Sequence, residues 1–163
     1  MPKPINHPSR SAFQLVSWSF LVLCLSWSAD PDVWELMTLG EGEEVGAAED
    51  AAIADMNGDG YPDIVVACEL AHLIYFQNPG PDARTARWER VIPSVTLDRG
   101  SFIRVWTADF DGDGRPEIVT PNKGAQNPER GTTVKNTISY FTLSPDPLDG
   151  DGWVEHELTQ VVI

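Results

Sequence analysis

The chain of 163 residues is long enough for one modest domain, and it carries 25 Asp and Glu against 11 Lys and Arg, a formal net charge of −14 at pH 7. This acidic balance disfavours nucleic acids and anionic membrane surfaces as partners, and it favours cations. Self-repulsion of this size also needs local relief if the domain is to stay compact.

The first 28 residues have the layout of a secretory signal peptide. Lys3 and Arg10 precede the apolar run AFQLVSWSFLVLCLSWSA, and small residues stand before a plausible cut at Ala29. We therefore expect residues 1–28 to be removed and the mature protein to be secreted, periplasmic or on the cell surface, with no further contact to a membrane. An uncleaved membrane anchor is the alternative, because the run approaches the lower length limit for a span.

Removal of this leader would leave one cysteine, Cys68, so the mature chain could form no intramolecular disulfide. Cys68 directly follows an apolar stretch with strand character. We expect it to be a small core residue rather than a reactive thiol.

The remaining sequence contains two copies of one unit, offset by 54 residues. ADMNGDGYPDIVVA begins at residue 54 and ADFDGDGRPEIVTP at residue 108, and Trp34 and Trp88 each precede the first aspartate of a copy by 21 residues. The second copy has a surplus of 11 residues between Val119 and Tyr140, in a stretch rich in Gly, Pro, Asn and Thr. This composition predicts an extended surface loop over 121–137.

Short runs with strand character recur four times in each copy. They are rich in Val, Ile, Tyr, Phe and Trp, several alternate at period two, and turn residues bound them. No window of the mature chain carries a helical stripe. Four strands per repeat of about 50 residues is typical of a propeller blade. The expected strands are 51–54, 63–68, 72–77 and 88–92 in the first copy and 102–108, 117–120, 137–143 and 153–158 in the second.

Each copy contains a loop with oxygen-bearing side chains at positions 1, 3, 5 and 9 and glycines at positions 4 and 6. Carboxylates this close repel one another unless a cation lies between them. Calcium accepts about six to eight oxygens from carboxylates, amides, backbone carbonyls and water, and glycine permits the tight turn. The pattern predicts one calcium site per loop, with a backbone carbonyl from position 7. The expected ligands are Asp55, Asn57, Asp59, Tyr61 and Asp63 in the first loop and Asp109, Asp111, Asp113, Arg115 and Glu117 in the second.

Other interpretations of the loops are less favoured. Magnesium requires stricter octahedral geometry, and zinc would require Cys or His, which neither loop contains. An EF-hand or dockerin would need a carboxylate at position 12, where Val66 and Thr120 stand, and a helix where Pro62 and Pro116 precede strands. Plain polar turns remain the alternative, because Asp-Gly and Asn-Gly favour hairpins for backbone reasons alone.

DMNGDGYPDIVVA and DFDGDGRPEIVTP resemble the FG-GAP/VCBS repeats, whose type case is the β-propeller of integrin α subunits. Val45-Gly46 stands where Phe-Gly is expected, which places the chain nearer the bacterial VCBS type. The resemblance implies loops that join adjacent strands of a blade and bind calcium. It also implies an all-β fold, with about two four-stranded antiparallel blades and one leading outer strand of an incomplete propeller. The expected organisation is a signal peptide over 1–28 and a partial propeller over 29–163, with an outer strand at 34–39 and blades at 50–92 and 101–160.

We expect an exported, calcium-binding module that provides a binding or scaffold surface and is not an enzyme. Its expected partners are calcium ions, the missing blades of a larger propeller, and a protein or carbohydrate ligand. The alternative is the propeller portion of a secreted carbohydrate-active enzyme, such as a polysaccharide lyase or hydrolase. The histidines of the mature chain, His72 and His156, lie in strand-like segments without a nucleophile partner, so the sequence indicates no catalytic residue.

Overall fold

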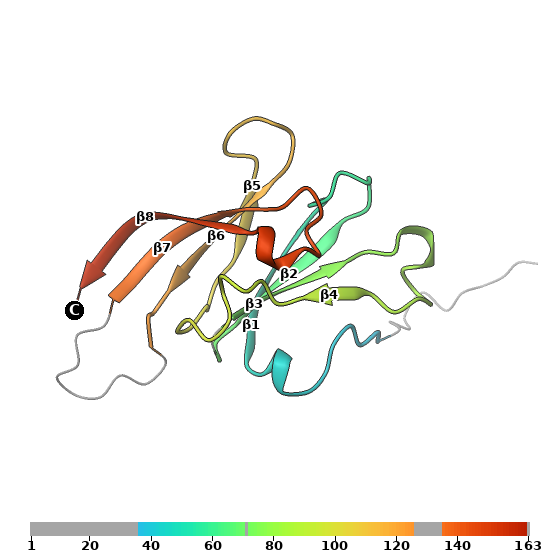
Figure 1. Cartoon of the computed structure of the whole chain (residues 1–163). Helices are drawn as coiled ribbons and strands as arrows, with labels where there is room; N and C mark the ends of the chain where they lie inside the picture. The colour runs from blue at the N-terminus through green and yellow to red at the C-terminus, as the bar shows by residue number, and fades with distance from the viewer. Residues whose placement is uncertain (1–35, 71, 126–134, 163) are drawn as a thin grey trace, which may run out of the picture. The chain divides into compact units, whose positions relative to one another are not determined.

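Two four-stranded antiparallel sheets follow one another along the chain in the computed structural model, which describes residues 36–70, 72–125 and 135–162 (Figure 1). The all-β fold class is confirmed, and each sheet has the strand order of a propeller blade. The predicted signal segment 1–28 lies outside the described residues. Within them, no helix has the length and apolarity needed to cross a bilayer.

The first sheet is ordered β1-β2-β3-β4 and the second β5-β6-β7-β8, so each is a simple meander. Helical structure in the described residues is limited to the short 3-10 turns η1 (Glu43–Val45), η2 (Gly80–Asp82) and η3 (Gly150–Gly152). The strands are β1 (Ala48–Ala54), β2 (Asp63–Cys68), β3 (His72–Gln77), β4 (Glu89–Val91), β5 (Trp106–Ala108), β6 (Glu117–Asn122), β7 (Lys135–Thr142) and β8 (Val154–Val162).

All eight strands expected in the two copies are present, and β2 and β3 begin and end at the predicted residues. The loop expected over 121–137 is shorter than predicted, because β6 continues to Asn122 and β7 already begins at Lys135. Pro121 lies inside β6 although proline interrupts most central strands. It is tolerated because the pairing of β6 with β5 ends at Val119, which leaves Pro121 with β7 alone as a partner strand.

The leading outer strand expected at 34–39 is not found in the described part of that range. Residues 36–39 form no strand, and residues 34 and 35 lie outside the described residues. A strand requires a hydrogen-bonded neighbour, and the first sheet begins its pairing with β1 and ends it with β4. Leu39 instead packs beside Val45 against the first sheet.

The main apolar core lies between the two sheets. Val65, Leu73 and Tyr75 of the first sheet are fully buried against Ile118 and Phe141 of the second. The ring of Tyr75 meets the ring of Trp153 edge-on, with 6.1 Å between centroids. This shared core makes the two sheets one packed unit. Its other buried members are Ala52, Met56, Ala67, Phe102 and Val105.

A second apolar cluster covers the far face of the first sheet and contains Cys68, Ile74, Phe76 and Trp88. β2 and β3 are therefore enclosed on both faces, which explains their almost uninterrupted apolar sequences. Cys68 is buried and free, and burial raises the pKa of its thiol to about 11. The prediction that Cys68 is a core residue is confirmed.

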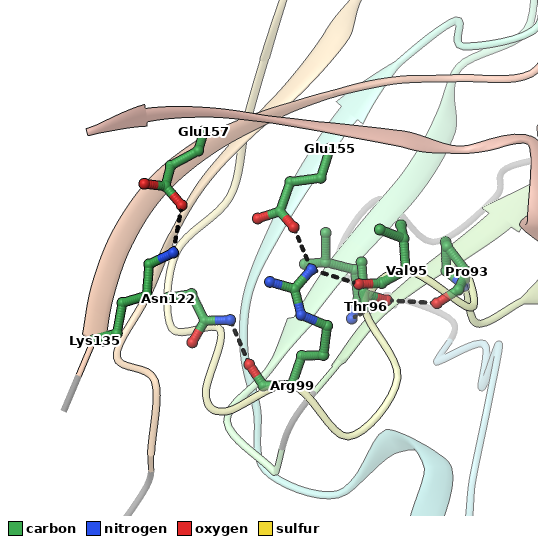
Figure 2. Close-up of polar contacts among 9 residues, drawn as sticks. Pro93, Val95, Thr96, Arg99, Asn122, Lys135, Glu155 and Glu157 are labelled. Atoms are coloured by element: carbon green, nitrogen blue, oxygen red, sulfur yellow. Dashed lines mark hydrogen bonds and ion pairs between the residues drawn. The ribbon is translucent and has the colours of Figure 1, made fainter. Parts of the chain in front are cut away.

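The segment between β4 and β5 is held to the second sheet by Arg99, as Figure 2 shows. Its guanidinium donates to the carbonyl of Val95 at 2.8 Å and pairs with the carboxylate of Glu155 in β8. Asn122 of β6 donates to the carbonyl of Arg99, and Thr96 donates to the carbonyl of Pro93 at 2.9 Å. These contacts fix the path of the chain from one sheet to the next.

Candidate metal centre

The two acidic loops occupy the same place in each sheet, between its first and second strands. Both loops turn on two glycines in the left-handed region of backbone space, which non-glycine residues rarely adopt. The φ angles agree closely between the copies. They are +77° at Gly58 and +89° at Gly60 in the first loop, and +79° at Gly112 and +91° at Gly114 in the second.

Hydrogen bonds within the loops also match. The carboxylate at position 1 accepts from the backbone N–H groups of both glycines, at 2.8 Å for each in the Asp55 loop and at 2.7 and 3.0 Å in the Asp109 loop. The side chain at position 3, Asn57 or Asp111, accepts from the N–H two residues on at 3.0 Å. Such contacts order an oxygen-rich loop without any ion, so they demonstrate a shared conformation rather than metal binding.

The acidic residue at position 9 is the first residue of the second strand in each sheet, and it is buried in both. Asp63 accepts from the N–H of Met56 at 3.0 Å, and Glu117 accepts from the N–H of Phe110 at 2.7 Å. The strand therefore holds this carboxylate beneath its loop. Burial there places a charge-bearing group where a cation would be sheltered from water.

Three carboxylates converge in the second loop. One oxygen each from Asp109, Asp111 and Glu117 lies within 4.8 Å of the other two. Oxygens on opposite sides of a calcium ion are about 4.6–5.2 Å apart, since each bond is about 2.3–2.6 Å long, so this set fits one calcium shell. A hollow of about 110 Å³ adjoins the set and is lined by Asp111, Asp113, Arg115 and Glu117, among other residues.

The first loop is arranged differently, because Asp63 is occupied by other groups. Oδ2 of Asp63 accepts from the hydroxyl of Tyr75 at 2.9 Å, and Oδ1 accepts from the N–H of Asn78 at 2.8 Å. Asn57 also donates from its side chain to Asp59 at 2.9 Å, a bond that the carboxylate of Asp111 has no N–H to make in the second loop. Within the described parts of the chain, no triple convergence of acidic side chains involves this loop.

The pKa of Asp63 is raised, first because burial disfavours its charged form; its hydrogen bonds to Asn78, Tyr75 and Met56 partly offset this effect. Burial likewise raises the pKa of the Tyr75 hydroxyl, and the neighbouring Asp63 raises it further. The tyrosine therefore remains a hydrogen-bond donor across the accessible pH range.

The residues at position 7, Tyr61 and Arg115, use their side chains for packing and hydrogen bonding. The ring of Tyr61 lies against Gly80, and the guanidinium of Arg115 donates to the carbonyl of Ser144 at 2.9 Å. The role predicted for their backbone carbonyls as calcium ligands stays a prediction. The same holds for the ligand roles of Asp55, Asn57, Asp59, Asp63 and Asp113.

Tyr75 and Asn78 were not among the candidate site residues, although both bind the carboxylate of Asp63. The sequence did contain a signal, since Tyr75 and Tyr140 stand at corresponding places in the two copies. That signal indicated only a strand, because the contact spans 12 residues and depends on how β2 pairs with β3.

Residues 55–120 match the family model described as FG-GAP-like repeat. This range begins at the first acidic loop and ends within β6, after the second loop. No curated protein matches the chain.

Proposed function

We propose that this chain, an FG-GAP-like repeat protein, is an exported calcium-binding module that provides a rigid surface for partners and catalyses no reaction. The family match supports a propeller-type binding module, and the convergence of Asp109, Asp111 and Glu117 is the observation that carries the calcium assignment. The acidic balance of the chain and its apolar leader are in keeping with a calcium-rich space outside the cell.

Calcium fits the second loop better than magnesium or zinc. The donors are hard carboxylate oxygens, and the loop contains no histidine or cysteine for zinc. The cluster contains three negative charges within 4.8 Å, and its cavity is lined in addition by Asp113. A divalent cation would relieve this repulsion and fix the loop to the buried start of β6, so binding stabilises the second sheet.

The first loop is the weaker calcium site in this proposal. It holds one carboxylate fewer, because position 3 is Asn57 in the first loop and Asp111 in the second. Calcium affinity depends on the number of charged ligands. Asp63 also already accepts hydrogen bonds from Met56, Tyr75 and Asn78. We expect dissociation constants of about 10⁻⁴ to 10⁻³ M, the range of extracellular calcium modules.

The proposed partners are a protein or carbohydrate ligand and the missing blades of a larger propeller. The absence of catalysis is proposed from the surroundings of the histidines. His72 is buried and contacts the backbone carbonyl of Glu44. His156 stacks on Tyr140 with ring centroids 4.5 Å apart, and its Nε2 lies 3.1 Å from the hydroxyl of Thr142. Among the described residues no carboxylate is hydrogen-bonded to the imidazole of His156, so the orienting third group of a catalytic triad is not found there.

Isothermal titration calorimetry with calcium chloride, on protein purified from an exporting host, tests the metal assignment. We expect binding that Asp111→Asn weakens at least tenfold. Asp98→Asn is the charge-matched control, because Asp98 is exposed and adjoins Arg99, which contacts Asn122 at the end of β6 opposite to the second loop. Unchanged binding in Asp111→Asn, or no calcium uptake by the folded parent chain, would contradict the assignment.

A further inference from the structure

The second sheet exposes an apolar row on the face that does not contact the first sheet. Trp106, Val119, Tyr140 and His156 are paired across β5, β6, β7 and β8 in one line. Side chains alternate between faces along a strand, and the neighbours Ile118 and Phe141 point into the core between the sheets. The row therefore lies on the opposite face. Trp106 is 59% exposed, and the nearby Phe110 and Leu158 are 60% and 58% exposed.

The corresponding row of the first sheet is covered. It consists of Ala52, Val65, Tyr75 and Val91, which pair across β1 to β4 as their counterparts do in the second sheet. Ala52, Val65 and Tyr75 belong to the core between the sheets. The open face of the second sheet is thus the same face that, in the first sheet, receives a neighbouring sheet.

The residues that cover the first row have their own counterparts. Ile118, Phe141 and Trp153 of the second sheet pack on the first row. By the repeat, they correspond to Ile64, Phe76 and Trp88, which lie together on the far face of the first sheet. The chain therefore carries an equivalent of each half of its internal interface on its outer faces, with Trp106 and His156 in the places of Ala52 and Val91.

One of these two halves is already covered by the chain itself, since Phe76 and Trp88 are only 2% and 8% exposed. Residues 36–47, the cover segment, place Leu39 and Val45 on the cluster that contains Phe76 and Trp88. A salt bridge of 2.5 Å between Glu44 and Arg90 holds the segment. A groove of about 820 Å³ lies beside the segment. Glu44, Trp88, Arg90 and Ile92 are among the residues that line the groove.

We propose that a second copy of this chain docks head-to-tail on the open face of the second sheet, through the far face of its own first sheet. Docking brings together the same two faces that meet inside the chain, with Trp106 in the place of Ala52, and it requires the cover segment to move off Phe76 and Trp88. Such a contact uses different surfaces on the two partners, so it is heterologous and extends beyond a dimer unless the rotation closes a ring. The docking role extends the binding function proposed above and rests on it, but it does not depend on calcium.

Sedimentation velocity over a concentration series, in the presence of a calcium chelator, tests the docking. The parent chain is expected to self-associate with a rising sedimentation coefficient. Trp106→Asp is expected to weaken association at least tenfold, because it places a charge where a large aromatic side chain would be buried on docking. Val45→Asp is expected to strengthen association, because it loosens the cover segment. Leu97→Asp serves as the control and is expected to behave as the parent, because Leu97 lies on the exposed turn that connects β4 to β5.

A mixing experiment tests the direction of docking. Trp106→Asp chains retain the far face of the first sheet, so labelled Trp106→Asp chains are expected to co-sediment with unlabelled parent. If they fail to do so while the parent associates, the open faces pair with each other and the head-to-tail arrangement is wrong.

Two further results would overturn the docking proposal. One is a parent and a Val45→Asp chain that both stay monomeric over the whole concentration series. The other is a Trp106→Asp chain that associates as strongly as Leu97→Asp. Phe110→Asp serves as a second variant, because Phe110 is as exposed as Trp106. Circular dichroism shows whether either variant has kept its fold.

Discussion

The hydroxyl of Tyr75 donates a hydrogen bond of 2.9 Å to the carboxylate of Asp63, and both side chains are fully buried. The same tyrosine ring meets Trp153 of the second sheet. One side chain therefore connects the first acidic loop, the centre of the first sheet and the interface between the sheets.

Tyr75→Phe is expected to lower the free energy of unfolding by about 1–3 kcal/mol, because it leaves a buried carboxylate oxygen with one donor fewer. It also raises the pKa of Asp63 further, since the hydroxyl favours the charged form. A folded-state pKa above the unfolded value means that the folded state takes up the proton first as pH falls. The loss is therefore largest at neutral pH and shrinks below the folded-state pKa of Asp63.

Urea denaturation of Tyr75→Phe at neutral and acidic pH measures both effects. Tyr140→Phe is the matched control, because Tyr140 occupies the corresponding place in β7 but is only half-buried and stacks on His156. A Tyr75→Phe chain as stable as Tyr140→Phe at neutral pH would show that the buried hydrogen bond contributes little.

The position-9 carboxylates are expected to differ in role. Glu117→Gln removes a charge from the converging set and is expected to weaken calcium binding about tenfold or more with little change in the stability of the calcium-free chain. Asp63→Asn is expected to destabilise the calcium-free chain by about 1–3 kcal/mol, because an amide cannot accept all three bonds without facing N–H donors with its own NH₂. Calorimetry and thermal melting with and without calcium separate the two effects. Equal loss of affinity in both variants would mean that the loops are equivalent sites.

Gly100→Ala is expected to be more damaging than Gly112→Ala, although both glycines have positive φ. At Gly112 an added Cβ meets open space, so the cost is the backbone strain alone, about 1–2 kcal/mol. At Gly100 it would lie 2.5 Å from Oδ1 of Asn122 and 2.9 Å from the backbone of Gly124, which requires the chain to move. Chemical denaturation of the two variants side by side checks the order. A smaller loss for Gly100→Ala would show that the connection yields easily.

The thiol of Cys68 is expected to be unreactive in the folded protein up to about pH 9, because burial raises its pKa to about 11 and excludes the reagent. Titration with an aromatic disulfide before and after unfolding measures this. The number of thiols that react after unfolding also tests whether the leader is removed. One reactive thiol per chain is expected if the leader containing Cys24 is removed, and two if it is retained.

Much of the fold was predictable because the two copies support each other. The strands β2 and β3 are short apolar runs between strong turn signals, and they were placed correctly. The ends of β6 and β7 were not, because Pro121 and the polar residues after it are typical of loops. Only the end of pairing with β5 makes a strand through this proline possible, and pairing is not a local property of sequence.

The candidate site was predictable as a pattern but not as a pair of unequal loops. Positions 1, 3, 5 and 9 match in both copies, and so do the loop conformations. The difference arises from Tyr75 and Asn78, which contact Asp63 from elsewhere in the sheet. In the second sheet Tyr140 stacks on the ring of His156 in β8. The corresponding residue in β4 of the first sheet is Val91, which has no ring.

The replacement of Ala52 by Trp106 at matching positions means that the two blades are not interchangeable. Alanine leaves room for Phe102 and Val105 to approach the first sheet, whereas an indole at that point would hold a neighbour further away. A chain with its blades in reversed order would therefore place the bulky surface inside and the small one outside. The difference in size between Ala52 and Trp106 therefore determines which sheet can come first in the chain. Two identical copies of one unit would carry no such preference.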